Sequence, residues 1–165
     1  ANGALGRAVV AAVRDRGDDV VAIDLSFGER DAGCRQLELD LSDADAVARA
    51  VGELERIDAL FNIAGGFAMG PTVHATTADE WQAMFTMNVI TMRNMCAAVV
   101  PREHGINVNA VLPSIIDTPT NRADMPDAEH GKWVAPADLA QVICFLGSPA
   151  ARAIHGALVP VCGLS

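Results

Sequence analysis

The sequence predicts an α/β fold in which a parallel β-sheet is covered by helices on both faces. Short, almost entirely apolar segments alternate along the chain with longer segments whose apolar residues recur every three to four positions. The short segments are typical of buried parallel strands, and the longer ones of amphipathic helices. Strands that alternate with helices in this way indicate a parallel sheet with helices on each side.

The first predicted helix lies in "GALGRAVVAAVRDRG". Leu5, Val9 and Val13 share one face of this helix, and Gly17 is a favourable residue for ending it. The segment "DVVAID", residues 19–24, follows as the first strand, because it is short and nearly all apolar.

A second strand, a second helix and a third strand are expected next. "RQLELDL" (35–41) is the strand, and "DADAVARAVGELER" (43–56) is the helix, with Ser42 and Asp45 approximating a capping box. "IDALFNIAGG" (57–66) is the third strand, and it runs into glycines.

The second half begins with a long helix, "ADEWQAMFTMNVITMRNMCAAVV", which Thr77 and Glu80 are expected to cap. A strand, a helix and a final strand then follow, in "INVNAVLP" (106–113), "PADLAQVICFLGS" (136–148) and "GALVPVCG" (156–163). No internal repeat or linker divides these 165 residues, so a single domain is expected.

Composition excludes several classes of function. The formal net charge of −9 makes nucleic acid or an anionic membrane surface an unfavourable partner. No apolar run reaches the roughly 18 residues of a spanning helix, and no secretory signal is evident, so a cytoplasmic protein is expected. The cysteines and histidines are scattered, without the spacing of a zinc site, so reduced thiols and no metal are expected.

Two glycines and an acid near the start suit a nucleotide. Gly3 and Gly6 open the first helix, where glycine lets the backbone approach a phosphate and unpaired N–H groups face it. Asp24 follows Gly6 by 18 residues, near the spacing of about 20 at which a carboxylate binds a ribose 2′-hydroxyl. A carboxylate there repels a 2′-phosphate, which favours NAD over NADP. The alternative is a solvated aspartate at a strand end.

Polar or small residues also end the next two predicted strands. Asp40 ends the second strand, and "FNIAGG" ends the third. Parallel sheets bind ligands outside the carboxyl ends of their strands, so these three strand ends are expected to face one ligand. Their convergence indicates a nucleotide site.

In this order and spacing, the motifs resemble the short-chain dehydrogenase/reductase family. The likeness is carried by "GALG", Asp24, "LDL" at Asp40, "FNIAGG", Asn88 and "VNAVLPSIIDTP", and it extends through nearly the whole chain. It implies a Rossmann-type doubly wound parallel sheet, with residues 1–165 forming a single NAD(P)-binding domain. Within the family, "AGGFAMG" and "LPSIIDTPTNRADMPDAEHGKW" are most similar to dihydropteridine reductases.

The resemblance also implies which residues contact the cofactor. Those of "FNIAGG" would support the sheet and line the adenosine side, and those after the strand 106–113 would pack around the nicotinamide and pyrophosphate. The full set is Asn2, Gly3, Leu5, Gly6, Asp24, Asp40, Leu41, Asn62, Ala64, Gly65, Pro113, Ile116 and Thr118.

Departures from the family pattern are as informative as the matches. Ile63 and Ser114 replace an Asn and a Gly of the family. The chain begins inside the glycine loop, without the family's first strand. A strand and helix that carry the catalytic Ser, Tyr and Lys are also expected between Val100 and Ile106, so the resemblance implies a missing segment near 100–102. The sequence has no tyrosine, and its only lysine is Lys132.

Asn88 is therefore the one catalytic candidate in the sequence. It lies four residues from Met84 and from Met92, so its amide is expected to be buried on an apolar stripe and hydrogen-bonded. One interpretation is a structural bond to a neighbouring strand. The other, implied by the resemblance, is a water-mediated proton relay to the family lysine. The surrounding methionines are expected to fill the core.

Four residues are expected on the substrate side. Phe67 and Met69 follow "AGG", and Met125 and Trp133 lie in the Pro-, Asp- and Gly-rich segment 121–136, which in the family covers the substrate. Trp133 packed in the core is the alternative.

Two functional hypotheses remain. The first is an NAD(H)-dependent oxidoreductase that transfers hydride to or from a small carbonyl, alcohol or quinonoid substrate, using a Tyr and Lys outside this sequence. The second is a catalytically inactive NAD-binding or sensor relative, or a truncated fragment. By resemblance, the partners are a small-molecule substrate and further copies of the chain, as a homodimer or homotetramer formed through the long helix.

Overall fold

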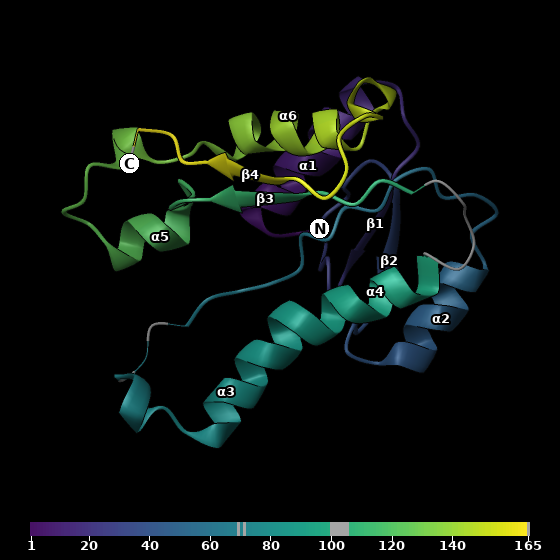
Figure 1. The fold of residues 1–165 in the computed structure, drawn as a ribbon. Coiled ribbons are helices and arrows are strands. Elements are labelled where there is room, and N and C mark those ends of the chain that lie inside the picture. Colours follow the sequence, from purple (N-terminus) through teal and green to yellow (C-terminus); the bar gives the residue numbers. More distant parts are fainter. Residues whose placement is uncertain (69, 71, 100–105, 165) are drawn as a thin grey trace.

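The computed structural model describes residues 1–68, 70, 72–99 and 106–164. Its strands form two separate parallel pairs (Figure 1). β1 (Val21–Asp24) pairs with β2 (Arg35–Glu38), and β3 (Ala110–Pro113) pairs with β4 (Leu158–Val161). All four strands lie within the segments that the sequence predicts.

One helical layer consists of α1 (Ala4–Asp15) and α6 (Pro136–Leu146), which lie side by side (Figure 1). α1 ends two residues before Gly17, as expected from the sequence. Both helices contribute to the larger hydrophobic core, in which Leu139 and Ala140 are fully buried. Val20, which precedes β1, packs against the same core.

The second helical layer consists of α2 (Ala44–Gly52) and α4 (Thr91–Val99), which also contact each other. Their core is built on Val47 and Met95, and Ile23 of β1 packs against it. Val20 and Ile23 are an odd number of positions apart, so in an extended chain their side chains point to opposite faces. The helices therefore cover both faces, and the predicted doubly wound arrangement is confirmed.

The predicted third strand, 57–66, is wrong as a strand, because these residues form no ladder in the described structure. A strand needs hydrogen-bonded neighbours, and no described strand pairs with this segment. Its apolar side chains still divide between the layers: Leu60 packs against the second core, whereas Phe61 and Ile63 pack against the first. The segment thus passes between the two cores, where a central strand would lie.

The long helix is confirmed in position but is not uniform. α3 (Ala78–Phe85) begins with the predicted capping box of Thr77 and Glu80, then a π-helical turn (Thr86–Ile90) leads into α4. α3 extends away from both helical layers (Figure 1). The predicted Ser42 cap of α2 is wrong, because the carboxylate of Asp43 accepts the N–H bonds of the first turn.

One short helix was not expected from the sequence. α5 (Pro119–Asp124) follows β3, and Thr118 caps it by accepting a hydrogen bond from the N–H of Asn121. Three short 3₁₀ turns complete the described elements, at Val73–Ala75, His130–Lys132 and Pro149–Ala151. Within the described ranges, every helix is too short or too polar to cross a membrane.

Candidate functional site

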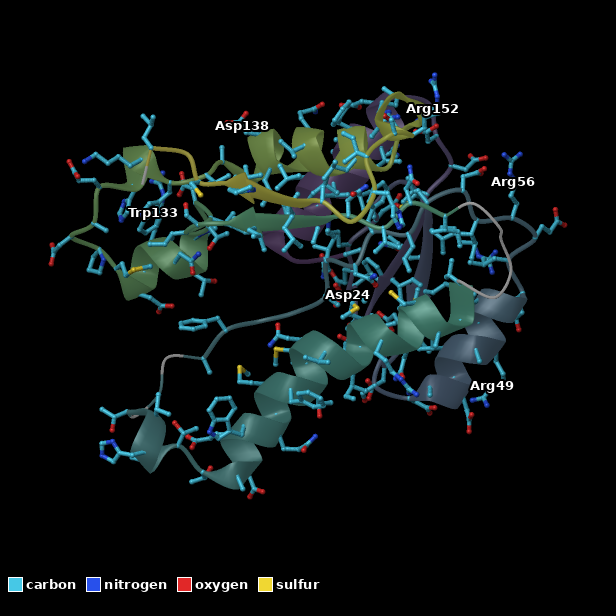
Figure 2. The ribbon with its side chains drawn as sticks, viewed as in Figure 1. Asp24, Arg49, Arg56, Trp133, Asp138 and Arg152 are labelled. Atoms are coloured by element: carbon cyan, nitrogen blue, oxygen red, sulfur yellow. The ribbon has the colours of Figure 1, made fainter. Side chains whose placement is uncertain are left out.

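Asp24 closes β1 and is held by three backbone nitrogens. The nitrogens of Ala1 and Asn2 each donate to its Oδ2 at 2.6 Å, and the N–H of Leu25 donates to its Oδ1 at 2.9 Å. Partial burial raises the pKa of the carboxyl, but the hydrogen bonds from these nitrogens outweigh it, so the pKa lies below its ordinary value. Asp24 is therefore an ionised acceptor at the carboxyl end of a parallel strand (Figure 2).

The turn before α1 is hydrogen-bonded directly to this carboxylate, because the backbone N–H of Asn2, which lies in that turn, donates to it. Gly3 is the N-cap residue, and no side chain caps the first turn of the helix. A Cβ on Gly6 would lie 2.6 Å from the carbonyl oxygen of Ala1, so the tight turn requires glycine there. Leu5 packs against the first core. The arrangement leaves a helix N-terminus open beside an ionised carboxylate, which suits a phosphate and a hydroxyl respectively.

Asp40 lies in the turn after β2. Its Oδ1 accepts hydrogen bonds from the N–H and the hydroxyl of Ser42, at 2.8 and 2.7 Å. The hydroxyl bond and the N–H bond hold the pKa of Asp40 below its ordinary value. The backbone of Leu41 next to it is fixed from α4, because the amide of Asn94 donates to the Leu41 and Ser42 carbonyls at 3.0 and 3.1 Å.

Asn94 is a functional candidate that the sequence reasoning missed. Its side chain is 3% exposed, and it is the one buried polar residue among those the structure describes. The available signal was the same as for Asn88: an amide inside an otherwise apolar helical segment. Asn94 therefore positions the turn that carries Asp40.

Asn88 lies in the π-helical turn and contacts the glycines that follow Asn62. Its Oδ1 accepts a hydrogen bond from the N–H of Gly66 at 3.0 Å, and its Nδ2 donates to the Met84 carbonyl at 3.0 Å. The expectation that Asn88 is buried is wrong, because its side chain is exposed. No described element covers this part of the long helix, and Met87 beside it is also exposed rather than part of the core.

The three residues "NIA" before these glycines occupy different environments. Asn62 is exposed, and its Nδ2 donates to the Sγ of Cys96 on α4 at 3.4 Å. Ile63 packs against the first core, and Ala64 is exposed. The hydrogen bonds of Asn62 and Asn88 thus fix the segment 62–66 along one side of the long helix.

The residues after β3 form a second group. Pro113 ends β3 opposite Val161. Ile116 pairs with Val134 in an isolated parallel bridge, and its carbonyl accepts a hydrogen bond from the amide of Asn121 at 2.7 Å. Thr118 caps α5. Among the described residues, no hydrogen bond joins this group to Asp24, so its part in one cofactor site stays a prediction.

The candidate substrate residues are separated from one another. Phe67 is 83% exposed, and Met69 lies outside the described residues. Met125 is half-buried, and its carbonyl lies 2.8 Å from the Nε2 of His130. Trp133 is buried and its ring centroid lies 4.5 Å from that of His130, which favours the packed interpretation. Across the described ranges, no group of three His, Cys, Asp or Glu side chains gathers as metal ligands would.

Comparison with known proteins agrees with this geometry. The profile of the family described as short chain dehydrogenase matches residues 1–102, which is more than half of the chain. Dehydrogenase/reductase SDR family member 6 of Xenopus laevis is 32% identical over 122 residues, covering 67% of this chain and 49% of that protein. L-rhamnose 1-dehydrogenase (NAD(P)(+)) of Sphingomonas sp. is 31% identical over 111 residues, covering 60% of this chain and 44% of that protein.

A solved structure shows the same fold. The carveol dehydrogenase of Mycobacterium avium, in complex with NAD, superimposes with a TM-score of 0.81 at 21% identity, covering 98% of this chain and 93% of that one. The chain spans about half the length of these two curated relatives. The uncapped turn beside Asp24, the helical layers on both faces and the match over residues 1–102 lead to one conclusion. This chain belongs to the short-chain dehydrogenase family.

Proposed function

We propose that this chain is the NAD-binding part of an oxidoreductase that transfers hydride to or from a small carbonyl, alcohol or quinonoid substrate. The observation that carries the proposal is the Asp24 carboxylate, ionised and fixed by backbone nitrogens next to an uncapped helix N-terminus. A catalytic Tyr and Lys would come from residues outside this sequence, in which tyrosine is absent. Residues 1–165 would form one cofactor-binding domain.

The residues present fit a nicotinamide dinucleotide. The N–H groups that open α1 at Gly3 would bind its pyrophosphate, because the helix dipole and unpaired donors both favour an anion. Asp24 would accept a hydrogen bond from the adenosine ribose, and the Asp40–Leu41 turn would lie on the adenine side. When bound, the nicotinamide supplies the hydride acceptor or donor, and the protein supplies position and charge.

The preference for NAD over NADP follows from the charge of Asp24. An ionised carboxylate at the ribose accepts from a 2′-hydroxyl but repels a 2′-phosphate. A related structure was solved with NAD, and a related dehydrogenase is named for both cofactors, so the comparisons support a nicotinamide cofactor without choosing between them.

On the reacting side, we propose Asn88 as a positioning group for a water that relays protons. Its Nδ2 and Oδ1 are bound to Met84 and Gly66, but each amide atom has further hydrogen-bonding capacity and the side chain is exposed. The substrate would then lie near Phe67, Met69 and Met125. Trp133 stays a weaker member of this group because it is buried.

A second candidate function is NAD binding without catalysis. It is favoured by the absence of tyrosine and by the position of Lys132, whose Nζ pairs with the carboxylate of Glu129. A protein with these residues alone would lack the acid that protonates a developing alkoxide. The intact mass of the natural protein separates the two functions. A mass several kilodaltons above 17.3 kDa leaves room for the catalytic segment, and a mass of 17.3 kDa supports binding alone.

The first prediction tests the cofactor site with Asp24→Asn. NAD affinity, measured by isothermal titration calorimetry, should fall by about tenfold, because the ribose loses a charged acceptor. NADP should bind relatively better, since the repulsion of its 2′-phosphate is removed. Asp58→Asn is the matched control, because Asp58 pairs only with exposed Arg56 and should leave both affinities unchanged. Equal NAD affinities for Asp24→Asn and the control would rule out the proposed role of Asp24.

A further inference from the structure

A pocket of about 280 Å³ lies between the outer face of α1 and the loop 27–33 that follows β1. Three arginines line it: Arg7 and Arg14 lie about two turns apart on the same face of α1, and Arg30 comes from the loop. The pocket extends along α1, and Asp24 is not among its lining residues. None of the proposed steps of hydride transfer uses these arginines.

The three guanidinium groups bind only neutral acceptors. Nη1 of Arg7 donates to the carbonyl of Asn2 at 3.1 Å, and Nη1 of Arg30 donates to the Oδ1 of Asn2 at 3.3 Å. Nη1 of Arg14 donates to the carbonyl of Ala32 at 3.1 Å. Each group has five N–H donors, so most of the donors in this pocket remain free for a ligand.

None of the three arginines of the pocket forms an ion pair with a described carboxylate, although all three line one pocket. Among the described residues, ion pairs do form at Arg16, Arg56 and Arg122, each with an aspartate, whereas none forms at the three arginines of the pocket. The protein carries a net charge of −9, so outside this pocket its acidic side chains outnumber its basic ones. Unpaired arginines also occur elsewhere on the surface, but these three gather at one pocket, and such a cluster of positive charge favours an anionic ligand.

The backbone is shaped to hold one of these groups in place. A Cβ on Gly33 would lie 2.6 Å from the Nη1 of Arg14, so the guanidinium rests on the bare glycine backbone. Gly33 also has a φ of 66°, which other residues rarely adopt. The N–H of Gly33 donates to the Oδ1 of Asp31 at 2.6 Å, which closes the turn below the pocket.

We propose that this pocket binds a small phosphate monoester. Three positive charges and the single negative charge of Asp31 leave an excess of two, which matches a phosphate dianion. Planar guanidinium groups bind phosphate through paired N–H bonds, and arginine is favoured for this role. A volume of about 280 Å³ is near the lower limit of small-molecule pockets, so it accommodates a phosphate with a short organic group.

The ligand would be separate from the dinucleotide, and this step rests on the proposed role of Asp24. If Asp24 accepts hydrogen bonds from the ribose hydroxyls, its negative charge would repel a phosphate attached to that ribose. Such a phosphate could not then lie next to Asp24 and reach the neighbouring pocket. Asn2 forms the common wall, since its nitrogen donates to Asp24 and its two oxygens face Arg7 and Arg30. A separate molecule is therefore the consistent source of the phosphate.

The test is a calorimetric titration of the protein with glycerol 1-phosphate at constant ionic strength. Arg7→Gln and Arg30→Gln should each weaken binding by about tenfold, because each removes one charge-assisted contact. Arg49→Gln on α2 is the matched control, since Arg49 lies on the other helical layer (Figure 2). Arg14 is left intact because its guanidinium packs on the backbone. Thermal unfolding without ligand checks that each variant is folded.

Each outcome decides the proposal. Weaker binding in both pocket variants, with NAD affinity unchanged, supports a separate phosphate site. Equal binding by the pocket variants and Arg49→Gln overturns it, as does a wild-type protein that shows no binding. The pocket variants are also titrated with NADP. If they lose affinity for NADP but not for glycerol 1-phosphate, the proposal is overturned, because the pocket would then be part of the dinucleotide site. NAD titration of the wild-type sample reports separately on the proposed function, so the two failures are distinguishable.

Discussion

At the scale of single residues, the ends of the strands carry the candidate chemistry, and its charge is controlled by hydrogen bonds from the Ser42 hydroxyl at Asp40 and from backbone nitrogens at both aspartates. Asp24 and Asp40 both have a lowered pKa, and each accepts hydrogen bonds from nearby backbone nitrogens. These bonds keep the two carboxylates ionised and fix their direction before any ligand arrives. Asn94 on α4 fixes the turn that carries Asp40. Its amide donates to the carbonyls of Leu41 and Ser42 and does not contact the Asp40 carboxylate.

Replacing Asn94 with Ala should lower the free energy of unfolding by about 1–3 kcal/mol, because the carbonyls of Leu41 and Ser42 lose their buried donor. NAD affinity should also fall, since the Asp40 turn is no longer held. Urea unfolding and NAD titration measure the two effects. Asn107→Ala is the control, because Asn107 is exposed and donates one similar bond to the Arg152 carbonyl. Equal destabilisation by both variants would contradict a positioning role for Asn94.

Asp117 makes the segment after β3 sensitive to acid. The hydrogen bonds from Arg122, at 2.5 and 2.7 Å, together with the positive charge of Arg122, lower the pKa of Asp117 from its ordinary value. Because the pKa is lower in the folded state, the stabilising contribution is complete above about pH 4 and is lost as pH falls through the folded pKa. Protonation removes the charge that holds Arg122 across the start of α5.

Trp133 reports this loss of order, because the N–H of Asp117 binds the Val134 carbonyl in the same segment. In a Trp81→Phe background, the emission of Trp133 should shift to longer wavelength as the pH falls below about 4. With Asp117→Asn added, this pH-dependent step should disappear. A step of the same size in both proteins would show that Asp117 does not cause it.

At the scale of elements, the packing of α1 against α6 stabilises the first core. Leu139 of α6 is 0% exposed, so Leu139→Ala leaves a cavity and should lower the free energy of unfolding by about 2–5 kcal/mol. Leu158→Ala in β4 is the control, because this leucine is 67% exposed and should change the free energy by no more than about 0.5 kcal/mol. Chemical denaturation measures both, and similar losses would mean that the core is elsewhere.

The sequence was sufficient for the order of these elements but not for the pairing of the strands. Apolar periodicity depends on the chain alone, which explains why α1, α2, α4 and α6 appear where they are expected. The segment 57–66 has the same local pattern as a strand, but a ladder depends on neighbours that no local pattern reveals. Its larger apolar residues are partly buried against the two cores, although the described segment forms no strand ladder.

The same limit applies to the candidate site. The spacing of Gly6 and Asp24 correctly brings a glycine turn to a strand end, because that spacing follows from one helix and one strand. The burial of Asn88 could not be predicted, because it depends on what covers the helix. The arginine pocket was also out of reach, since Arg7 and Arg30 become neighbours only through the turn of the loop 27–33.

At the scale of the whole molecule, the long helix leaves a large apolar surface without a partner. Trp81, Phe85, Met87 and Met92 are between 40% and 58% exposed. Exposed apolar surfaces of this kind favour association. They support the proposal that copies of the chain form a homodimer or homotetramer through α3 and α4.

Phe85→Glu should therefore shift the protein toward monomers, because it places a charge among these exposed apolar side chains. Light scattering coupled to size-exclusion chromatography measures the mass at a fixed concentration, and the dissociation constant should rise by at least about tenfold. Val108→Glu is the control, since Val108 is 60% exposed but lies outside the long helix. An unchanged mass for Phe85→Glu would place the interface elsewhere.

The segment 57–63, whose side chains divide between the two cores, has a consequence for how the protein opens. A stretch that belongs to both cores cannot leave one of them without disturbing the other. The amides of α1 and α2 should then exchange with solvent through one common opening reaction, as a single cooperative unit rather than as two. If the proposed nucleotide site lies at the strand ends, a nucleotide bound there would slow exchange in both layers at once.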